Sequence, residues 1–167
     1  MNRLTARDIV RTALDIEQTG MQAYRRMAKA TSDEELHHLL DYLAGEEEEH
    51  ASLFSEMFRA ISIDSATMPA PSPEDSAYLE VVLRSIVFAG PRSGIGLAES
   101  ATTPVAMLES ALRFERDTML FWLKLFRLVR EQDRLLIEQL IRQEEEHIRN
   151  IDHALKQRLS GPGPTLK

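Results

Sequence analysis

Two short segments of this sequence pair a glutamate with a histidine three residues later, inside runs of acidic residues. Glu47 and His50 lie in "EEEEH", and Glu144 and His147 lie in "QEEEH". Residues three apart on an α-helix share a face, so each pair could contact one metal ion. Carboxylate-rich ligation with one imidazole per metal suits iron or manganese better than zinc, which prefers nitrogen and sulfur.

Hydrophobic residues at helical spacing place both pairs on the inner face of a helix. Leu43 and Phe54 continue the apolar stripe on which the first pair falls, and Leu140 and Ile151 do the same for the second pair. The other glutamates of the two runs fall off these stripes, and we interpret them as solvent-exposed: Glu46, Glu48, Glu49, Glu145 and Glu146.

The position before each inward glutamate differs between the two runs. Glu46 lies four residues before His50 and could compete with Glu47 as its partner on the helix. The equivalent position of the second run is Gln143, and this difference favours Glu47 as the inward residue.

Two further glutamates interrupt apolar stripes elsewhere in the chain. Glu17 lies four residues from both Ala13 and Met21, and Glu115 has the same place in a second copy of the pattern. Buried carboxylates without partners cost several kcal/mol each, on the order of the desolvation penalty of an ion. The stripes carry no basic residue at this level, whereas two divalent cations would neutralise the set. The predicted metal ligands are Glu17, Glu47, His50, Glu115, Glu144 and His147.

The elements that carry these residues form two similar helical hairpins, at about residues 4–60 and 104–158. The first helices of the two hairpins align at an offset of 98 residues and the second helices at 97, so the hairpin loops differ by one residue. Short loops make the helices within each hairpin antiparallel, while the connector 62–103 is long enough to cross the bundle. We therefore predict an all-α four-helix bundle in which the second and third helices are parallel.

Capping patterns and composition indicate where the elements begin and end. Helix starts are predicted at Thr5-x-x-Asp8, at a capping box of Ser32 with Glu35, and at Thr103 followed by Pro104. Within the connector, 62–76 is rich in proline and serine, 78–87 is a short apolar helix or strand, and 90–96 is a loop. We expect one domain over residues 1–159 and a flexible tail over 160–167.

Composition excludes several classes of function. The net charge of −7 without a basic block argues against nucleic acid or an anionic membrane as a partner. The chain has no cysteine, which excludes disulfides, thiolate catalysis and cysteine-ligated metal sites. No signal peptide or membrane-spanning run is visible, so we expect a cytoplasmic protein.

One glutamate on the first and third helices, with Glu-x-x-His on the second and fourth, resembles the di-iron carboxylate site of ferritin-like proteins. The "ALxxE" and "EEEH" segments are similar to those of the rubrerythrin branch in particular. The resemblance implies that Glu47 and Glu144 bridge two iron ions, or manganese in their place. It further implies terminal ligands and one histidine for each ion, namely Glu17, Glu115, His50 and His147.

Two departures from this family concern its activity. Thr118 stands where peroxide-reducing rubrerythrins usually carry a further glutamate. The chain also lacks the cysteines of a rubredoxin domain, so an external protein would have to donate electrons.

The resemblance implies a di-iron oxidoreductase that reduces peroxide or dioxygen, and we expect a homodimer. A ferroxidase or iron-storage protein with Fe²⁺ as substrate is an alternative, and so is a non-catalytic bundle that the metals stabilise. Tyr24 and Trp122 occupy matching positions and are either neighbours of the metal ligands, with a redox role, or ordinary core residues. Glu80 and Glu99 of the connector could lend an extra carboxylate, while surface or capping roles are expected for His37, His38 and His153.

Overall fold

The computed structural model describes residues 6–63, 72–86, 101–129 and 131–160 of the 167-residue chain. All elements in this part are α-helices. They are α1 (Ala6–Ala30), α2 (Glu34–Ile63), α3 (Pro73–Ile86), α5 (Pro104–Leu128) and α6 (Glu131–Ser160).

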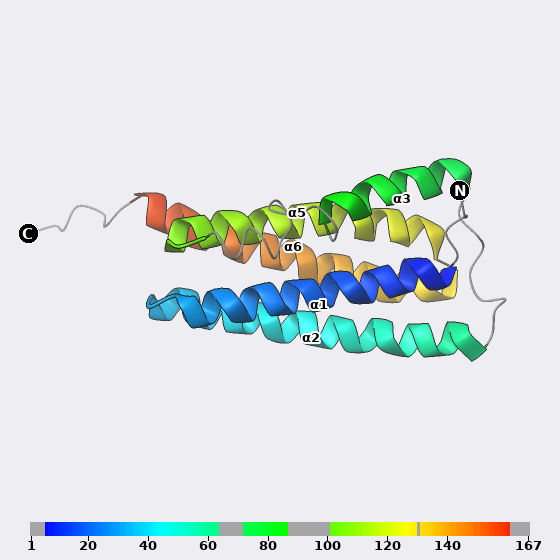
Figure 1. The fold of residues 1–167 in the computed structure, drawn as a ribbon, viewed down its shortest axis with the longest axis horizontal. Coiled ribbons are helices and arrows are strands. Elements are labelled where there is room, and N and C mark those ends of the chain that lie inside the picture. The colour runs from blue at the N-terminus through cyan, green and yellow to red at the C-terminus, as the bar shows by residue number, and fades with distance from the viewer. Residues whose placement is uncertain (1–5, 64–71, 87–100, 130, 161–167) are drawn as a thin grey trace, which may run out of the picture.

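The four long helices form the predicted bundle of two antiparallel hairpins. Helix α1 packs against α2, and α5 packs against α6, while α2 and α5 run in the same direction (Figure 1). Between the hairpins, helix α3 runs back along the bundle, opposite in direction to α2, and packs against α5 (Figure 1). The prediction of an all-α four-helix bundle is therefore confirmed, and residues 78–86 of the apolar connector segment belong to a helix.

Loop lengths explain the unequal offsets of the repeat. Residues 31–33 separate α1 from α2, whereas only residues 129–130 separate α5 from α6. The second hairpin is thus shorter by one residue at its turn, as the sequence comparison requires.

The core consists of apolar stripes from all four long helices. Burying one large apolar side chain contributes about 1.5–3 kcal/mol, so these stripes supply most of the stability of the bundle. The largest fully buried apolar side chains include Ile16, Tyr24, Leu36, Leu40, Leu43, Phe54, Leu108, Phe121 and Trp122.

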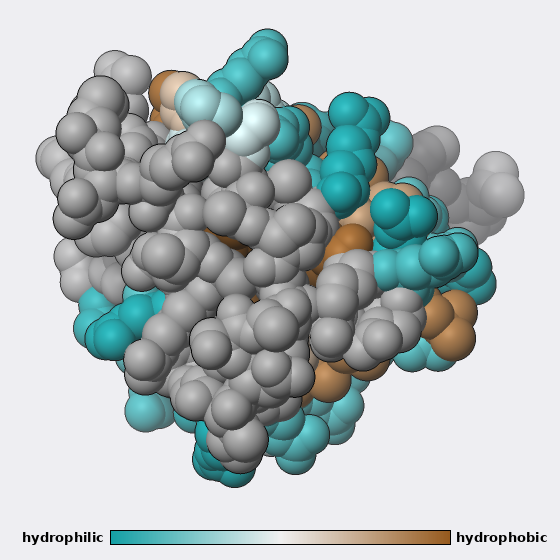
Figure 2. All heavy atoms as spheres, turned by 90° about the vertical axis from the view of Figure 1, so that its right-hand side faces the viewer, coloured by the Kyte–Doolittle hydropathy of each residue, from teal (hydrophilic) through white to brown (hydrophobic). Residues whose placement is uncertain are grey.

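At the end of the bundle where α5 ends and α6 begins, the coloured residues of Figure 2 are mainly hydrophilic.

The helix starts agree with the predicted caps at one site and differ at another. Thr103 caps α5 by accepting a hydrogen bond from the Ala106 N–H at 3.2 Å, with Pro104 next in the chain, as predicted. For α2 the prediction of Ser32 is wrong, because the Oδ1 atom of Asp33 accepts the Leu36 N–H at 2.9 Å. Asp33 also binds the guanidinium group of Arg158, at 2.8–3.1 Å, near the end of α6.

Some predicted features lie outside the described residues: Thr5, the loop 90–96, Glu99 and residues 161–167, together with the Glu80 side chain. Ser160 is the last residue of α6, so this helix continues one residue beyond the predicted domain boundary. Among the described helices, none combines the length and apolar character needed to cross a membrane.

Candidate metal centre

All six predicted ligands lie together inside the bundle. Glu17 comes from α1 and Glu115 from α5, while α2 and α6 each contribute a glutamate and a histidine one turn apart. Each of the six residues is at most 3% exposed. Their inward orientation follows from the helical period, because each replaces an apolar residue in the stripe that its helix buries.

The six side chains form two overlapping groups of four. One group contains Glu17 and His50, and the other contains Glu115 and His147. Both groups contain Glu47 and Glu144, and the ligand atoms within each group lie within 4.8 Å of one another. Glu47 and Glu144, which both groups share, would be the residues in contact with both ions of a metal pair.

The Nδ1 atoms of the two histidines face the carboxylates. The Nδ1 atom of His50 lies 3.2 Å from Glu144 Oε1, 3.7 Å from Glu17 Oε2 and 3.8 Å from Glu47 Oε2. On the other side, His147 Nδ1 lies 3.3 Å from Glu144 Oε2 and 3.7 Å from Glu115 Oε1. The two imidazole rings are stacked, with centroids 5.9 Å apart.

The polar atoms of the cluster satisfy one another poorly. Within the described part of the chain, seven of its buried side-chain atoms have no hydrogen-bond partner: Glu17 Oε1, His50 Nδ1, Glu115 Oε2, both Glu144 oxygens and both His147 nitrogens. A buried polar group without a partner costs about 1–3 kcal/mol. Because one ligand atom from each residue lies within 4.8 Å of the others in its group, divalent cations would satisfy these atoms together, so the residues fit a di-metal site.

Burial dominates the proton affinity of three of the four carboxyl groups. It raises the pKa values of Glu47 and Glu115 well above their usual range, with repulsion from neighbouring carboxylates adding to the effect. Burial also raises the pKa of Glu17. For Glu144 the two adjacent histidines outweigh burial and lower the pKa to about 2. Protons can therefore compensate the buried negative charge, and a divalent cation would have to displace them.

Burial acts on the pKa values of the two histidines in the opposite direction. Burial alone would lower their pKa values, but the surrounding carboxylates outweigh it and raise the pKa of both His50 and His147. Glu144, which lies between the two rings, is the largest of these opposing influences on both histidines.

Comparison with known proteins agrees with this geometry. The family model described as Rubrerythrin matches residues 8–86, which include α1 from Asp8 onward, α2 and α3. A solved structure from Thermotoga maritima, described as a ferritin-like diiron-carboxylate protein, superposes with a TM-score of 0.65 at 20% identity. That match covers 95% of this chain and 99% of the other. Residues 8–86 therefore resemble rubrerythrins, and the chain has the ferritin-like fold. No curated protein sequence matches it.

The two aromatic residues at matching positions, Tyr24 and Trp122, have different surroundings. The Tyr24 hydroxyl donates a buried hydrogen bond to Glu115 Oε1, so Tyr24 directly contacts a predicted ligand. Burial and the nearby carboxylates raise the pKa of Tyr24 and keep it protonated. Trp122 stacks on Phe54 at a centroid distance of 5.2 Å. Its Nε1 atom is buried and has no hydrogen-bond partner among the described residues.

Thr118 and Gly20 lie at equivalent positions, each three residues after a predicted terminal ligand. The Thr118 hydroxyl donates to the Glu115 backbone carbonyl at 3.0 Å, so this position offers no carboxylate. A Cβ atom at Gly20 would lie 2.8 Å from Phe114 Cε1 and 3.1 Å from Glu47 Cδ. Gly20 therefore makes room for a predicted bridging residue, a role that the sequence analysis missed.

The prediction that Glu46 is solvent-exposed is wrong. Its side chain is only 22% exposed, and its Oε2 atom lies 3.9 Å from His147 Nε2 on α6. The other four glutamates of the two runs are exposed as predicted. Sequence periodicity placed Glu46 at the edge of the stripe but could not show that the neighbouring hairpin brings a histidine to that edge.

The remaining histidines lie away from the centre. His37 contacts the Ala28 carbonyl oxygen at 2.9 Å through Nδ1 and Asp41 at 3.2 Å through Nε2, which ties the start of α2 to the end of α1. His38 and His153 are exposed. The surface and capping roles predicted for these three residues agree with their positions.

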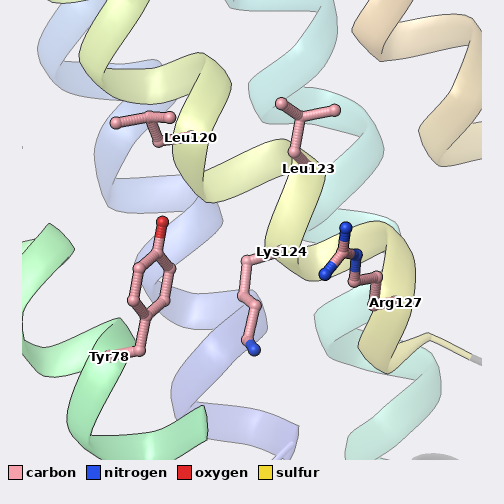
Figure 3. A pocket seen from close by; sticks show the side chains of 5 residues that line it. All are labelled: Tyr78, Leu120, Leu123, Lys124 and Arg127. Atoms are coloured by element: carbon pink, nitrogen blue, oxygen red, sulfur yellow. The ribbon is translucent and has the colours of Figure 1, made fainter.

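A separate groove lies on the surface between α3 and α5 (Figure 3). It is lined by Tyr78 of α3 and by Leu120, Leu123, Lys124 and Arg127 of α5. Lys124 forms an ion pair with Asp75 and lies 5.3 Å from the centroid of the Tyr78 ring. These contacts attach α3 to α5, and none of the six predicted ligands lines the groove.

Proposed function

We propose that the protein is a non-haem di-iron oxidoreductase that reduces peroxide or dioxygen at a carboxylate-bridged metal pair. The observation that supports this best is the pair of overlapping ligand groups that share Glu47 and Glu144. Each group offers three carboxylates and one imidazole, a ligand set that suits iron, with manganese as the alternative. In the proposal each metal has its own terminal pair, Glu17 with His50 or Glu115 with His147.

When bound, two reduced iron ions would supply the two electrons that break the O–O bond of peroxide. Two protons complete the products, which are two water molecules. The chain contributes a rigid frame, since every proposed ligand lies on a long helix and is buried in the core. The Tyr24 hydroxyl donates a hydrogen bond to Glu115 Oε1 and fixes the orientation of that carboxylate.

Electrons would come from an external donor protein, because the chain has no cysteine with which to hold an iron–sulfur or rubredoxin centre. We further propose that the protein acts as a homodimer. Size-exclusion chromatography with light scattering tests this point, since a storage protein would instead form a shell of many subunits.

The test of the proposed function is peroxide consumption by iron-loaded, pre-reduced protein. We expect turnover that the double variant Glu47→Ala, Glu144→Ala does not support. A variant of the exposed residue Glu49, Glu49→Ala, is the matched control on the same helix and should retain activity. Equal activity in the wild type and the double variant would refute the proposal. Metal analysis of protein purified without added metal then decides between iron and manganese, with two ions per chain expected.

A ferroxidase is the second candidate, and the absence of cysteine favours it in one respect. Fe²⁺ as a substrate brings its own electrons, so oxidation by dioxygen or peroxide needs no donor protein. Multiple-turnover Fe²⁺ oxidation at more than two ions per chain would support this candidate. Oxidation that stops at two ions per chain would support the oxidoreductase.

A further inference from the structure

One exposed side of α5 combines apolar with basic residues. Arg116, Leu120, Leu123 and Arg127 are all exposed, and their spacing of three or four residues places them on the same side of the helix. Leu120 is 50% exposed and Leu123 is 48% exposed. Both leucines and Arg127 line the groove beside α3 (Figure 3). We call these four residues the α5 face.

The α5 face carries positive charge in a protein whose net charge is −7. Arg116 and Arg127 form no ion pair with any residue that the structure describes. Basic residues on α6 are instead paired, since Arg142, Arg149 and Lys156 each lie 2.5–3.8 Å from an acidic residue one turn away. The two arginines of the α5 face are therefore available to carboxylates of another protein, which the acidic surfaces elsewhere would repel.

A second copy of the chain fits the α5 face poorly. A two-fold axis brings the same surface of both subunits together. Leu120 lies four residues after Arg116, and Leu123 lies four residues before Arg127. An antiparallel pairing of Leu120 with Leu123 of the partner subunit therefore also places Arg116 beside Arg127 of the partner subunit. Like charges opposite one another are unfavourable, so the face favours an acidic partner of a different kind.

Behind the α5 face, aromatic side chains connect α5 with the helix that carries His50. Trp122 packs against Phe121 at a centroid distance of 4.7 Å and stacks on Phe54 of α2 at 5.2 Å. All three rings are fully buried. Phe54 lies one turn after His50 on the same side of α2. The rings thus form a closely packed path from α5 to the turn beside a proposed ligand, and close packing favours electron tunnelling.

We propose that the α5 face is the docking surface for the external electron donor, a protein with acidic and apolar residues around its redox centre. Complexes that transfer electrons typically bury less than about 1,200 Å², so a face about three helical turns long is sufficient. Each encounter transfers one electron, so two encounters reduce an oxidised pair of iron ions and oxidise two donor molecules. This inference rests on the proposed function and names the partner of that site.

The probe for the test is an acidic plant-type [2Fe–2S] ferredoxin. Added to ¹⁵N-labelled protein as purified, it should shift or broaden the backbone amide signals of residues 116–127 more than those of α1 and α2. The double variant Arg116→Glu, Arg127→Glu should slow reduction of the iron-loaded protein by reduced ferredoxin about tenfold at low ionic strength, the lower end of the range for electrostatic steering. Ferredoxin binding, measured from the amide signals, should weaken by a similar factor.

The matched control is the double variant Lys29→Glu, Arg59→Glu, which changes the net charge equally at exposed positions of α1 and α2. It should bind ferredoxin nearly as tightly as the wild type. Reduced methyl viologen, a small dye that needs no docking surface, should reduce both double variants at equal rates. If the control weakens ferredoxin binding as much as Arg116→Glu, Arg127→Glu, a general charge effect explains the data and the inference is overturned. Ferredoxin contacts at another surface would overturn it as well.

Two further measurements separate this inference from its alternatives. If Arg116→Glu, Arg127→Glu changes the number of subunits in light scattering, the α5 face is a contact between copies and the inference is overturned. Peroxide consumption with methyl viologen as reductant, but without ferredoxin binding at the α5 face, would overturn this inference alone. Ferredoxin binding at the α5 face without peroxide consumption would overturn the proposed function and support the docking surface.

Discussion

Replacing Gly20 by alanine should loosen the candidate metal centre without altering any proposed ligand. The new methyl group would lie 2.8 Å from Phe114 Cε1, a distance at which one of the two groups must move. The Phe114 ring is only 5% exposed and packs edge-on against Tyr24 at a centroid distance of 6.1 Å, so it has little room. The other neighbour, Glu47 Cδ at 3.1 Å, would also have to shift.

Two opposing effects determine the magnitude. Overpacking a core costs about 1–3 kcal/mol, whereas alanine stabilises a helix interior by about 1 kcal/mol relative to glycine. The net loss for Gly20→Ala is then about 0–2 kcal/mol. Gly45→Ala is the matched control, because Gly45 lies inside α2 and a Cβ atom there meets nothing within 4 Å. The difference between the two variants isolates the overpacking cost of about 1–3 kcal/mol, or roughly 2–12 °C in Tm.

Thermal unfolding followed by circular dichroism measures this difference, and Co²⁺ titration measures the effect on Glu47. We expect Gly20→Ala to weaken Co²⁺ binding about tenfold, as for other changes that disturb the orientation of a ligand. If Gly20→Ala is as stable as Gly45→Ala and binds Co²⁺ with wild-type affinity, the reasoning from the Gly20 contact is refuted.

Three further predictions concern other contacts. Asp33→Ala should destabilise the fold by about 1–2 kcal/mol through the lost cap and ion pair, while Asp33→Asn should retain most of the cap. The Leu36 N–H and Arg158 lower the pKa of Asp33 below its ordinary 3.8. In urea titrations, the difference in unfolding free energy between the wild type and Asp33→Ala should therefore be complete above pH 3.8 and should decline as the pH falls below it. Tyr24→Phe should cost about 1–3 kcal/mol by leaving Glu115 without its donor, whereas Tyr42→Phe at an exposed site should be nearly neutral in the same assay. Chelating the bound metal should lower Tm, and metal at a hundredfold excess over Kd should restore about 2.7 kcal/mol of stability; an unchanged Tm would contradict metal binding by the cluster.

The sequence alone predicts the bundle and the convergence of the six residues, because the argument needs only the helical period and the internal repeat. A carboxylate inside an apolar stripe must face the core, and four such stripes can pack in few ways. The second copy was decisive, since Gln143 in place of Glu46 identified Glu47 as the inward residue.

The features that sequence reasoning missed depend on residues far away in the chain. Ser32 and Asp33 are both good capping residues, and the structure pairs Asp33 with Arg158, which lies 125 residues later. The position of Glu46 likewise depends on His147 of the opposite hairpin. Local patterns contain no information about such contacts, because the contacts arise only when the two hairpins dock.

The division of the ligands between the hairpins has a consequence for the motions of the bundle. Each group of four takes three residues from one hairpin and one from the other, since Glu144 completes the group of Glu17 and Glu47 completes the group of Glu115. Packing within each hairpin is also more extensive than packing between them. Bound ions would therefore act as crosslinks across the weaker of the two interfaces. The sub-global opening that separates the hairpins is then the motion that metal suppresses most, and slower amide exchange on the facing sides of the two hairpins would report it.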